Sequence, residues 1–298
     1  MDINFYNRYT DKNEIEKVYG EGFLRWLYES SSGKMLAPVL VKKFLSKAYG
    51  YLQNTKISSQ KIIPFIAQYD INMDNFEKNL PENYAGYDTF NDFFIRKYKK
   101  GKRPYPTEPN LMGAIAEGRY LGWEQIKEDQ TFPVKGRFLD YKAILGNPKW
   151  YDEFCEGPLV IARLCPVDYH RFHFPDDGEV VEDYRVEGVL HSVNPLAISL
   201  KEDIFLTNER HVTILDTKNF GKLAYIEVGA ICVGKIKQSY SSKSFKRGDE
   251  KGYFLFGGST VILLGQKGKL KLSQDIIKNT NSRIETYVRL GDTIAESI

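Results

Sequence analysis

The chain has 298 residues and a formal net charge of +3, and 42% of its residues are hydrophobic. This length allows one large domain, or a catalytic domain with a smaller appendage. The small net charge argues against a nucleic-acid-binding protein, but it is compatible with an anionic membrane surface if the basic residues cluster. The 20 tyrosines and 18 phenylalanines favour strands over a helical bundle.

The first 80 residues or so show the apolar periodicity of helices. Helical patterns are expected from Asn13 onward, over 36–52, over 62–66 and over 73–80, and three lysines accompany the second. Such segments would either lie on lipid or pack on their own core with solvated lysines. The chain has no N-terminal apolar signal core and no apolar run near the ~20 residues that span a bilayer, so any membrane association is expected to be peripheral.

Residues 85–110 form a junction between this region and the rest of the chain. An aromatic segment, 90–96, leads into a basic run, 97–103. Such a run is either a solvated loop or, beside aromatic residues, a contact for lipid phosphates.

From about residue 112 the pattern becomes that of strands separated by turns. The strands are predicted over 113–123, 158–167, 179–193, 210–216, 222–237, 253–256, 261–265 and 284–290. We therefore expect an α+β protein, with an N-terminal helical membrane-associating region followed by a β-rich catalytic domain.

The three cysteines, Cys155, Cys165 and Cys232, are widely spaced and form neither a CxxC pair nor a zinc pattern. We expect buried thiols in a reducing cytoplasm.

A serine lies between two predicted strands, directly after two glycines. Ser259 follows Gly257 and Gly258, where the backbone is unusually free. This arrangement suits a hydroxyl that attacks the peptide bond just before it. The alternative is a glycine turn in a β-rich core.

A serine nucleophile needs a base, and two of the four histidines lie in one short segment. His170 and His173 are three residues apart, but no HExxH motif or further nearby ligand accompanies them, so an acid–base role is favoured over a metal site. Either histidine alone could instead be a hydrogen-bonded structural residue. The candidate carboxylate is Glu117, which precedes a glycine in an otherwise apolar strand and would be costly to bury unpaired. An exposed strand-end glutamate is the alternative.

Several blocks in order now carry a specific resemblance. They are Phe93-Phe94-Ile95-Arg96 with Gly101-Lys102-Arg103-Pro104, Lys135-Gly136 with Leu145-Gly146, Pro166-Val167-Asp168-Tyr169-His170-Arg171-Phe172-His173, Asn208-Glu209-Arg210, Val228-Gly229-Ala230-Ile231-Cys232-Val233-Gly234 and Phe256-Gly257-Gly258-Ser259-Thr260. Together they resemble the phosphatidylserine decarboxylase proenzymes, a pyruvoyl-dependent family of prokaryotic type. The resemblance covers most of the chain beyond residue 90, and the N-terminal region fits more loosely.

The resemblance implies self-cleavage by a charge relay. Ser259 would attack the carbonyl of Gly258, with His173 as the base and Glu117 orienting it. The family pattern normally has aspartate where this chain has Glu117, which is one methylene longer. Because small misplacements can slow catalysis ~100-fold, this departure puts the rate of self-cleavage in question.

Cleavage would leave a β chain, 1–258, and an α chain, 259–298, that remain associated. The resemblance implies that the α chain begins with a pyruvoyl group made from Ser259, with no metal. The ketone of this group would form a Schiff base with phosphatidylserine and accept the electrons released as CO2 leaves, giving phosphatidylethanolamine. His170 would position the substrate carboxylate or return a proton to the carbanion.

The resulting expectation is a carboxy-lyase with two regions, a helical and membrane-facing one over 1–85 and a β-rich catalytic domain over 86–298. It would act at an anionic membrane surface, peripherally on the cytoplasmic face of the cell membrane. The sequence does not decide whether the protein forms a homodimer. Two alternatives are a pyruvoyl decarboxylase with a soluble substrate and an uncleaved relative that only binds anionic phospholipid. A serine hydrolase is disfavoured because the chain lacks a GxSxG elbow.

Overall fold

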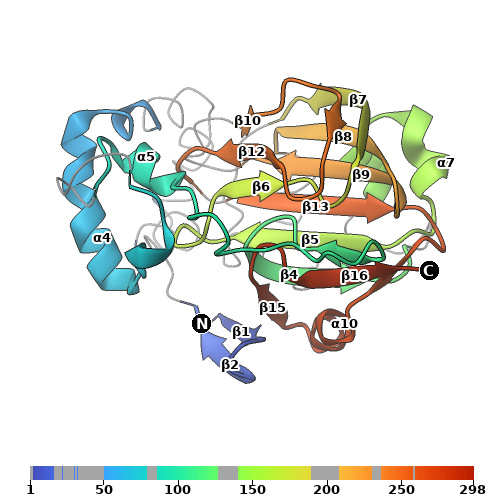
Figure 1. The fold of residues 1–298 in the computed structure, drawn as a ribbon, viewed down its shortest axis with the longest axis horizontal. Coiled ribbons are helices and arrows are strands. Elements are labelled where there is room, and N and C mark those ends of the chain that lie inside the picture. Colours follow the sequence, from blue (N-terminus) through green and yellow to red (C-terminus); the bar gives the residue numbers. More distant parts are fainter. Residues whose placement is uncertain are drawn as a thin grey trace.

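The computed structural model describes residues 3–16, 22, 30, 32, 50–78, 86–126, 140–188, 208–229, 236–257 and 259–298. This part of the chain is an α+β structure with mostly strands and few helices. In Figure 1 the strands occupy the middle of the molecule, with α4 (Ile62–Tyr69) and α5 (Phe90–Phe94) at one end and α7 (Tyr151–Phe154) at the other.

A ten-stranded sheet forms the frame of the molecule, in the order β11-β7-β8-β9-β13-β5-β4-β15-β1-β2. Its strands are β1 (Asn4–Asn7), β2 (Lys12–Ile15), β4 (Gly118–Trp123), β5 (Leu159–Leu164), β7 (Gly178–Val186), β8 (Arg210–Thr217), β9 (Gly221–Val228), β11 (Ser244–Phe245), β13 (Ser259–Gly265) and β15 (Glu285–Val288). Neighbours are antiparallel except β1 and β15, which run parallel. Strand β13 lies in the interior of this sheet, paired with β9 on one side and β5 on the other.

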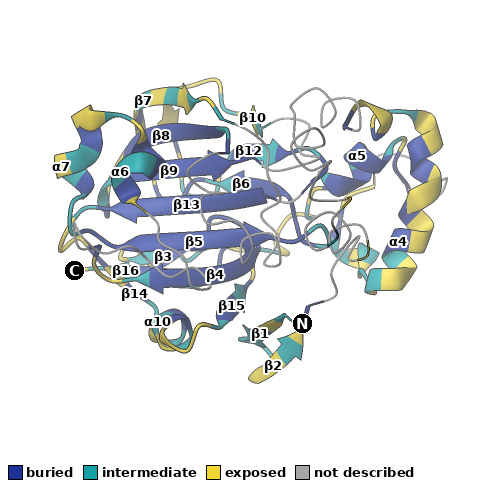
Figure 2. Ribbon diagram, turned by 180° about the vertical axis from the view of Figure 1, so that it is seen from behind, coloured by how far each residue is buried: buried dark blue, intermediate teal, exposed yellow. Residues whose placement is uncertain are grey.

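Two three-stranded sheets pack on this frame. One is β10 (Ile236–Gln238), β12 (Glu250–Phe254) and β6 (Arg171–His173), and the other is β14 (Leu270–Leu272), β16 (Thr293–Ser297) and β3 (Leu111–Gly113). Apolar side chains from all three sheets form one continuous core, which includes Phe172, Phe254, Leu272 and Ile294. Figure 2 shows that the central strands are buried almost throughout.

The remaining helices are short. They are η1 (Lys56–Lys61), η2 (Met73–Asn75), α6 (Tyr141–Leu145), η4 (Pro148–Trp150) and α10 (Gln274–Asn281). Helix α5 begins at an N-cap in which the Thr89 side chain accepts a hydrogen bond from the Asp92 backbone N–H. The phenylalanines of α5 pack with Phe65 of α4 and with Phe256, close to the end of the loop that precedes β13. This second core therefore ties the helices to the predicted cleavage segment.

The predicted start of the first helix at Asn13 is wrong, and the rest of that pattern, over 17–27, lies outside the described residues except for residue 22. Residues 4–15 form the β1–β2 hairpin, whose turn contains Asp11 at a φ of 54°. Strand β1 joins the large sheet by pairing with β15, a partner far away in the sequence. Tertiary pairing of this kind overrides a helical apolar period, because intrinsic propensity is a weak preference.

The other N-terminal predictions have different outcomes. Helix α4 confirms the segment over 62–66, whereas 73–80 yields only the η2 turn, after which Phe76 is extended and bridges Tyr98. The segment over 36–52 lies almost wholly outside the described residues. In the described part of the chain, no helix is both long enough and apolar enough to cross a bilayer.

Most of the predicted strands are confirmed, but two of them divide. The strand over 222–237 ends as β9 at Val228, and β10 begins at Ile236. Strands β5, β8, β13 and β15 lie where they were expected. The predicted strand over 113–123 divides, because β3 ends at Gly113 and β4 begins at Gly118. Glu117 therefore lies in the bend between two strands, whereas the prediction placed it within a strand.

Candidate active site

Ser259 is the first residue of β13, and its side chain is completely buried. Its backbone lies opposite Leu164 of β5. Two residues earlier, Gly257 has a φ of 145°, a conformation that a residue with a Cβ rarely adopts. Gly258 lies outside the described residues. The predicted nucleophile thus begins a central strand directly after a turn that requires glycine.

His170 is the imidazole that contacts Ser259. Its Nδ1 lies 3.2 Å from Ser259 Oγ, and its Nε2 lies 2.9 Å from the backbone oxygen of Cys165. Because a carbonyl oxygen can only accept, Nε2 carries the proton and donates it to Cys165. Nδ1 then presents a lone pair to the serine hydroxyl. This is the arrangement of a nucleophile and its general base.

The surroundings of His170 keep its ring neutral. The ring is fully buried, and the Phe94 ring stacks on it with 3.8 Å between the two centroids. Burial, together with the nearby charge of Arg96, lowers the pKa of His170 to about 3. Nδ1 is therefore unprotonated near neutral pH and can accept the proton of Ser259.

Arg96 binds the loop that precedes His170. Its guanidinium donates to the backbone oxygens of Val167 at 2.9 Å and Asp168 at 3.1 Å. The same group lies over the rings of Phe76 and Phe93, 4.5 and 4.9 Å from their centroids. A buried cation is thereby held by aromatic faces and carbonyl oxygens.

Asn91 fixes the chain just before the predicted cleavage position. Its Oδ1 accepts a hydrogen bond of 2.8 Å from the Phe256 backbone N–H, and its Nδ2 donates to Asn54 at 2.9 Å. Helix α5 therefore supplies both a stacking ring for His170, in Phe94, and a backbone anchor for the segment that enters β13.

His173, the predicted base, faces other groups. Its Nδ1 lies 2.9 Å from the backbone oxygen of Gly248, and its Nε2 lies 3.3 Å from the Tyr169 hydroxyl. Nδ1 therefore donates to Gly248, and Nε2 faces Tyr169. Burial lowers the pKa of His173 as well. The structure places His170, and not His173, in contact with Ser259.

Glu117, the predicted orienting carboxylate, is buried and fully engaged. Arg103 Nε donates to its Oε2 at 2.6 Å, and the hydroxyls of Tyr98 and Tyr287 each donate to its Oε1 at 2.8 Å. Burial alone raises the pKa of Glu117, but the bonds from Arg103 and the tyrosines outweigh this effect and lower it. The described contacts of Glu117 do not include His173. The charge of Glu117 is instead neutralised by Arg103, which belongs to the basic run over 97–103.

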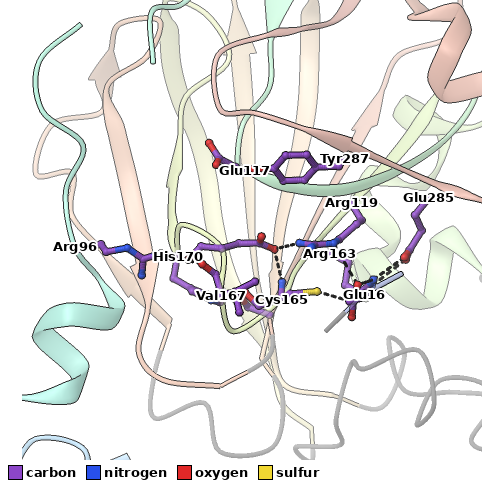
Figure 3. A network of polar contacts seen from close by, with 12 residues as sticks. Glu16, Arg96, Glu117, Arg119, Arg163, Cys165, Val167, His170, Glu285 and Tyr287 are labelled. Carbon is purple, nitrogen blue, oxygen red and sulfur yellow. Dashed lines mark hydrogen bonds and ion pairs between the residues drawn. The ribbon is translucent and has the colours of Figure 1, made fainter. Parts of the chain in front are cut away.

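A buried network of charges lies beside the His170 loop (Figure 3). Arg163 pairs with Glu16 and with Glu285 at 2.6 Å each, while Arg119 pairs with Glu16 at 3.2 Å and with Asp168. Burial opposes ionisation of Glu16, but the two arginines lower its pKa to about 2. The network connects the N-terminal hairpin, strands β4, β5 and β15, and the loop before His170.

The described residues contain no group of three or more histidine, cysteine, aspartate or glutamate side chains that could hold a metal ion. Cys165 is buried, as predicted, whereas Cys155 is only half-buried, because it lies at the margin of the core beyond α7. Cys232 lies outside the described residues.

Sequence reasoning did not single out four residues of this site, namely Asn91, Phe94, Arg96 and Asp168. Three belong to motif blocks quoted above, and the fourth, Asn91, lies just before one of them, so their positions in the chain were noticed. Their roles depend on contacts with residues far away in the sequence, such as the contact between Asn91 and Phe256. No rule of sequence spacing predicts those contacts.

Comparisons with known proteins identify the family of this chain. Residues 90–296 match the model of the family described as phosphatidylserine decarboxylase. A phosphatidylserine decarboxylase proenzyme of Clostridium tetani (strain Massachusetts / E88) is 41% identical over 295 residues, covering 99% of this chain and 98% of the relative. Proenzymes of the same name from Clostridium perfringens (strain SM101 / Type A) and Desulfitobacterium hafniense (strain DSM 10664 / DCB-2) are 40% and 39% identical, over 98% of this chain and 99% and 97% of the relatives. The chain belongs to the phosphatidylserine decarboxylase family.

Proposed function

We propose that this protein converts phosphatidylserine to phosphatidylethanolamine and CO2, using a pyruvoyl group made from its own Ser259. The observation that carries the proposal is the 3.2 Å contact between Ser259 Oγ and a neutral, buried imidazole, His170, directly after the Gly257 turn. Family membership supports the reaction, and the contact supports the choice of residue.

Self-cleavage begins when Ser259 Oγ attacks the carbonyl carbon of Gly258 while His170 Nδ1 takes the hydroxyl proton. The C–N bond between Gly258 and Ser259 breaks, and His170 passes the proton to the departing nitrogen, so that an ester replaces the amide. Loss of the Ser259 α-proton then expels the Gly258 carboxylate and leaves dehydroalanine. One water molecule converts this product into the pyruvoyl group and ammonia.

The site fits a pyruvoyl group at position 259. The side chain there is buried against His170, and the adjacent Thr260 has a buried hydroxyl with no hydrogen-bond partner in the described structure. Once formed, the group supplies an electron sink for the bond that releases CO2. His170 Nδ1 stays beside position 259, where a proton must return after CO2 has left, and the Phe94 ring that stacks on His170 also packs against Phe256.

The choice between the two histidines is open to a direct test. The family resemblance assigns the base to His173 with Glu117, and we favour His170 because it is the ring in contact with Ser259. We expect His170→Asn to slow self-cleavage at least ~100-fold, the usual contribution of general base catalysis. His173→Asn should slow it by less than tenfold. The opposite ranking would return the role of base to His173.

Interleaved strands support the association of the two chains after cleavage. The proposed α chain, 259–298, contributes β13 and β15 to the large sheet, and every neighbour of these two strands belongs to the proposed β chain, 1–258. Cutting the chain before β13 leaves these ladders of hydrogen bonds in place. The fragments are therefore expected to behave as one molecule.

We also propose that the region over 1–85 faces the membrane and that 86–298 is the catalytic domain. Large apolar side chains are exposed at and just before α4, namely Tyr51 (72%), Leu52 (57%), Ile57 (76%) and Ile63 (60%). In Figure 2 much of the α4 ribbon is coloured as exposed. Two lysines, Lys56 and Lys61, are exposed on the same segment. Apolar anchors flanked by basic residues suit peripheral attachment to anionic lipid. The free thiols of Cys155 and Cys165 agree with the cytoplasmic face of the membrane.

The intact mass of the purified protein under denaturing conditions tests the proposal first. We expect two species matching 1–258 and 259–298, with the smaller lighter by one ammonia than a peptide that begins with serine. Ser259→Ala should remain a single chain. A single mass for the native sequence would favour the alternative of an uncleaved relative that binds anionic phospholipid.

Release of CO2 then identifies the substrate. Vesicles that contain phosphatidylserine should support release, and soluble serine derivatives should not. Cleavage without release from the lipid would favour the soluble-substrate alternative. As a control for attachment, Ile57→Glu and Ile63→Glu should weaken binding to anionic vesicles and leave self-cleavage intact.

A further inference from the structure

Phe256, three residues before Ser259, is attached to helix α5 in two ways. Its ring packs edge-on against the rings of Phe90 and Phe94, with 5.1 and 5.0 Å between the centroids. Its backbone N–H donates a hydrogen bond of 2.8 Å to Asn91 Oδ1. The ring contacts hold the side chain, whereas the bond to Asn91 acts on the backbone, which leads directly to the bond that is to be cut.

The backbone is fixed again at Ser259, which begins β13 opposite Leu164 of β5. Between this point and Phe256 lie Gly257 and Gly258, and glycine has the widest choice of backbone conformations of any residue. Attack on the Gly258 carbonyl requires the Ser259 hydroxyl to approach within about 3–3.5 Å in a suitable direction. If the backbone at Phe256 were released, the two glycines would gain freedom, and the chain would adopt the attacking geometry less often.

The Asn91 amide is itself oriented by partners on its other side. Its Nδ2 donates to Asn54 Oδ1 at 2.9 Å and to the Gly50 backbone oxygen at 3.4 Å. Because a carbonyl oxygen can only accept and the Phe256 N–H can only donate, these partners determine which end of the amide faces Phe256. The Asn91 backbone N–H also donates to the Gln53 oxygen at 3.1 Å. The buried Asn91 is therefore held both at its backbone and at its side chain.

We propose that Asn91 is a positioning residue of self-cleavage, which holds the Phe256 backbone so that the Gly258 carbonyl meets the Ser259 hydroxyl. This inference rests on the proposed function, because it gives Asn91 a part in the attack of Ser259. It goes further in naming a residue outside the charge relay that the sequence predicted. The described contacts of Asn91 are with the chain before the cut and not with Ser259. An amide suits this task, since it offers an acceptor to one neighbour and donors to others.

The main test compares the self-cleavage rates of Asn91→Leu and a matched control, Thr280→Val. Each substitution nearly keeps the volume of the side chain and removes a buried oxygen that accepts from a distant backbone N–H. For Thr280, on α10, this N–H is that of Gly122 in β4, at 2.9 Å. We expect Asn91→Leu to slow cleavage about 100-fold, the effect of a small misplacement, and the control to stay within about fivefold.

Asn91→Asp tests whether the acceptor at this position is what matters. Burial favours the neutral acid, whose carbonyl oxygen can accept from the Phe256 N–H and whose hydroxyl can donate to Asn54. We therefore expect Asn91→Asp to cleave at least about tenfold faster than Asn91→Leu. Its advantage should grow as the pH is lowered from 8 to 6, since the protonated acid reproduces both bonds of the amide.

Hydrogen exchange separates positioning from folding. In a Ser259→Ala background, which blocks cleavage, Asn91→Leu should accelerate exchange of the Phe256 amide, because this N–H loses its acceptor. The amide of Ile262, in the middle of β13, serves as the reference for unfolding of the sheet. The acceleration at Phe256 should exceed that at Ile262 at least about tenfold, as expected for a local change.

Several outcomes would overturn the inference. Cleavage of Asn91→Leu within fivefold of the parent, or an equal loss in Thr280→Val, would remove Asn91 from the role. So would equal acceleration of exchange at Phe256 and Ile262, or a rate for Asn91→Asp no higher than that for Asn91→Leu. If Asn91→Leu is insoluble, Asn91→Ser carries the same comparison, because its hydroxyl is too short to replace the amide oxygen. Failure of the parent chain to cleave at all would instead contradict the proposed function.

Discussion

At the scale of single residues, the low pKa of His170 shapes the chemistry of proton transfer. A buried imidazole that stays neutral can accept the Ser259 proton at any pH near neutrality. Once protonated, the same ring is a strong acid, because burial and Arg96 disfavour its charged form. It should therefore pass the proton rapidly to the departing nitrogen. Such a group suits the proposed self-cleavage, which happens once in each chain and moves the proton over a short path.

The same shift predicts how stability depends on pH. A histidine with a folded pKa of about 3 and an ordinary value of 6.5 binds its proton first in the unfolded chain. The free energy of unfolding should therefore fall as the pH drops below 6.5. His173 contributes in the same direction, while carboxyl groups with lowered pKa values, such as Glu16, act only below about 4.5. Denaturant unfolding of Ser259→Ala between pH 4.5 and 7.5 measures this slope.

In the Ser259→Ala background, His170→Asn should make the dependence of the unfolding free energy on pH shallower. His173→Asn should do so to a smaller or similar extent. An unchanged slope in His170→Asn would mean that the ring is not a buried neutral group in solution.

Arg96 provides a second prediction at this scale. Arg96→Met keeps an apolar stem between Phe76 and Phe93 but removes the donors to the Val167 and Asp168 carbonyls. Buried carbonyls left unpaired cost about 1–3 kcal/mol each, so for these two we expect a loss of about 2–6 kcal/mol in unfolding free energy and slower self-cleavage. The matched control is Arg289→Met, because Arg289 also lies over a ring, that of Tyr9, but is exposed.

The control should stay within about 0.5 kcal/mol of the parent, as surface substitutions usually do. Equal losses in the two variants would show that ring contact, and not the carbonyl bonds, stabilises the protein at Arg96.

Residue-level prediction from sequence found the turn before Ser259, where a local pattern carried the signal. The two glycines before Ser259 imply a special turn, and Gly257 has the positive φ that such a turn requires. The histidine segment was recognised as the source of acid–base groups. Which histidine meets Ser259 depends on how residues 165–170 fold between β5 and β6, and that path is set by contacts with Arg96 and Arg119. The three-residue spacing between His170 and His173 does not reveal those contacts.

At the scale of elements, a buried ion pair connects one small sheet to the large one. Lys251 of β12 is completely buried, and its Nζ donates to Glu227 of β9 at 2.6 Å, to Thr213 of β8 at 2.9 Å and to Gln238 of β10 at 3.0 Å. All three donors of the ammonium group are therefore used. Strand β12 leads directly to the Gly257 turn, so this contact also sets where the cleavage segment leaves the sheet.

Lys251→Met should be severely destabilising. It leaves the Glu227 carboxylate buried without its cation, and breaking a buried pair in this way costs about 3–5 kcal/mol. The double variant Lys251→Met, Glu227→Leu should recover part of the loss, because no charge remains uncompensated. Lys267→Met is the control, since its pair with Glu156 is at the surface, where an ion pair contributes little to stability. Thermal or denaturant unfolding in the Ser259→Ala background measures all three, and a loss of less than 1 kcal/mol in Lys251→Met would contradict the prediction.

Elements with a strong local period were predictable, and those stabilised by distant partners were not. The strands β5, β8 and β13 carry continuous buried runs and were found from sequence. The hairpin of β1 and β2 was missed, because its strands are only four residues long and one of them pairs with β15 from the far end of the chain. The break at Glu117 was missed for a similar reason, since the charge is satisfied by Arg103.

At the scale of the whole molecule, the proposed cleavage divides a chain whose two parts are woven together. Strand β13 lies between β9 and β5, β15 lies between β4 and β1, and β16 pairs with β3. The α chain also holds the β chain through side chains, as in the pair of Glu285 with Arg163 and the bond from Tyr287 to Glu117. Neither part can bury its core without the other.

This interdependence predicts how the processed protein unfolds. In native buffer the two chains should co-elute on size exclusion at all practical dilutions, and they should separate only when the sheets unfold. Because unfolding then releases two molecules, the midpoint for the processed protein should rise with protein concentration, whereas the midpoint for the uncleaved Ser259→Ala chain should not. Release of the α chain on dilution while the sheets remain folded would show that the strands of the α chain are held less tightly than their position inside the large sheet implies.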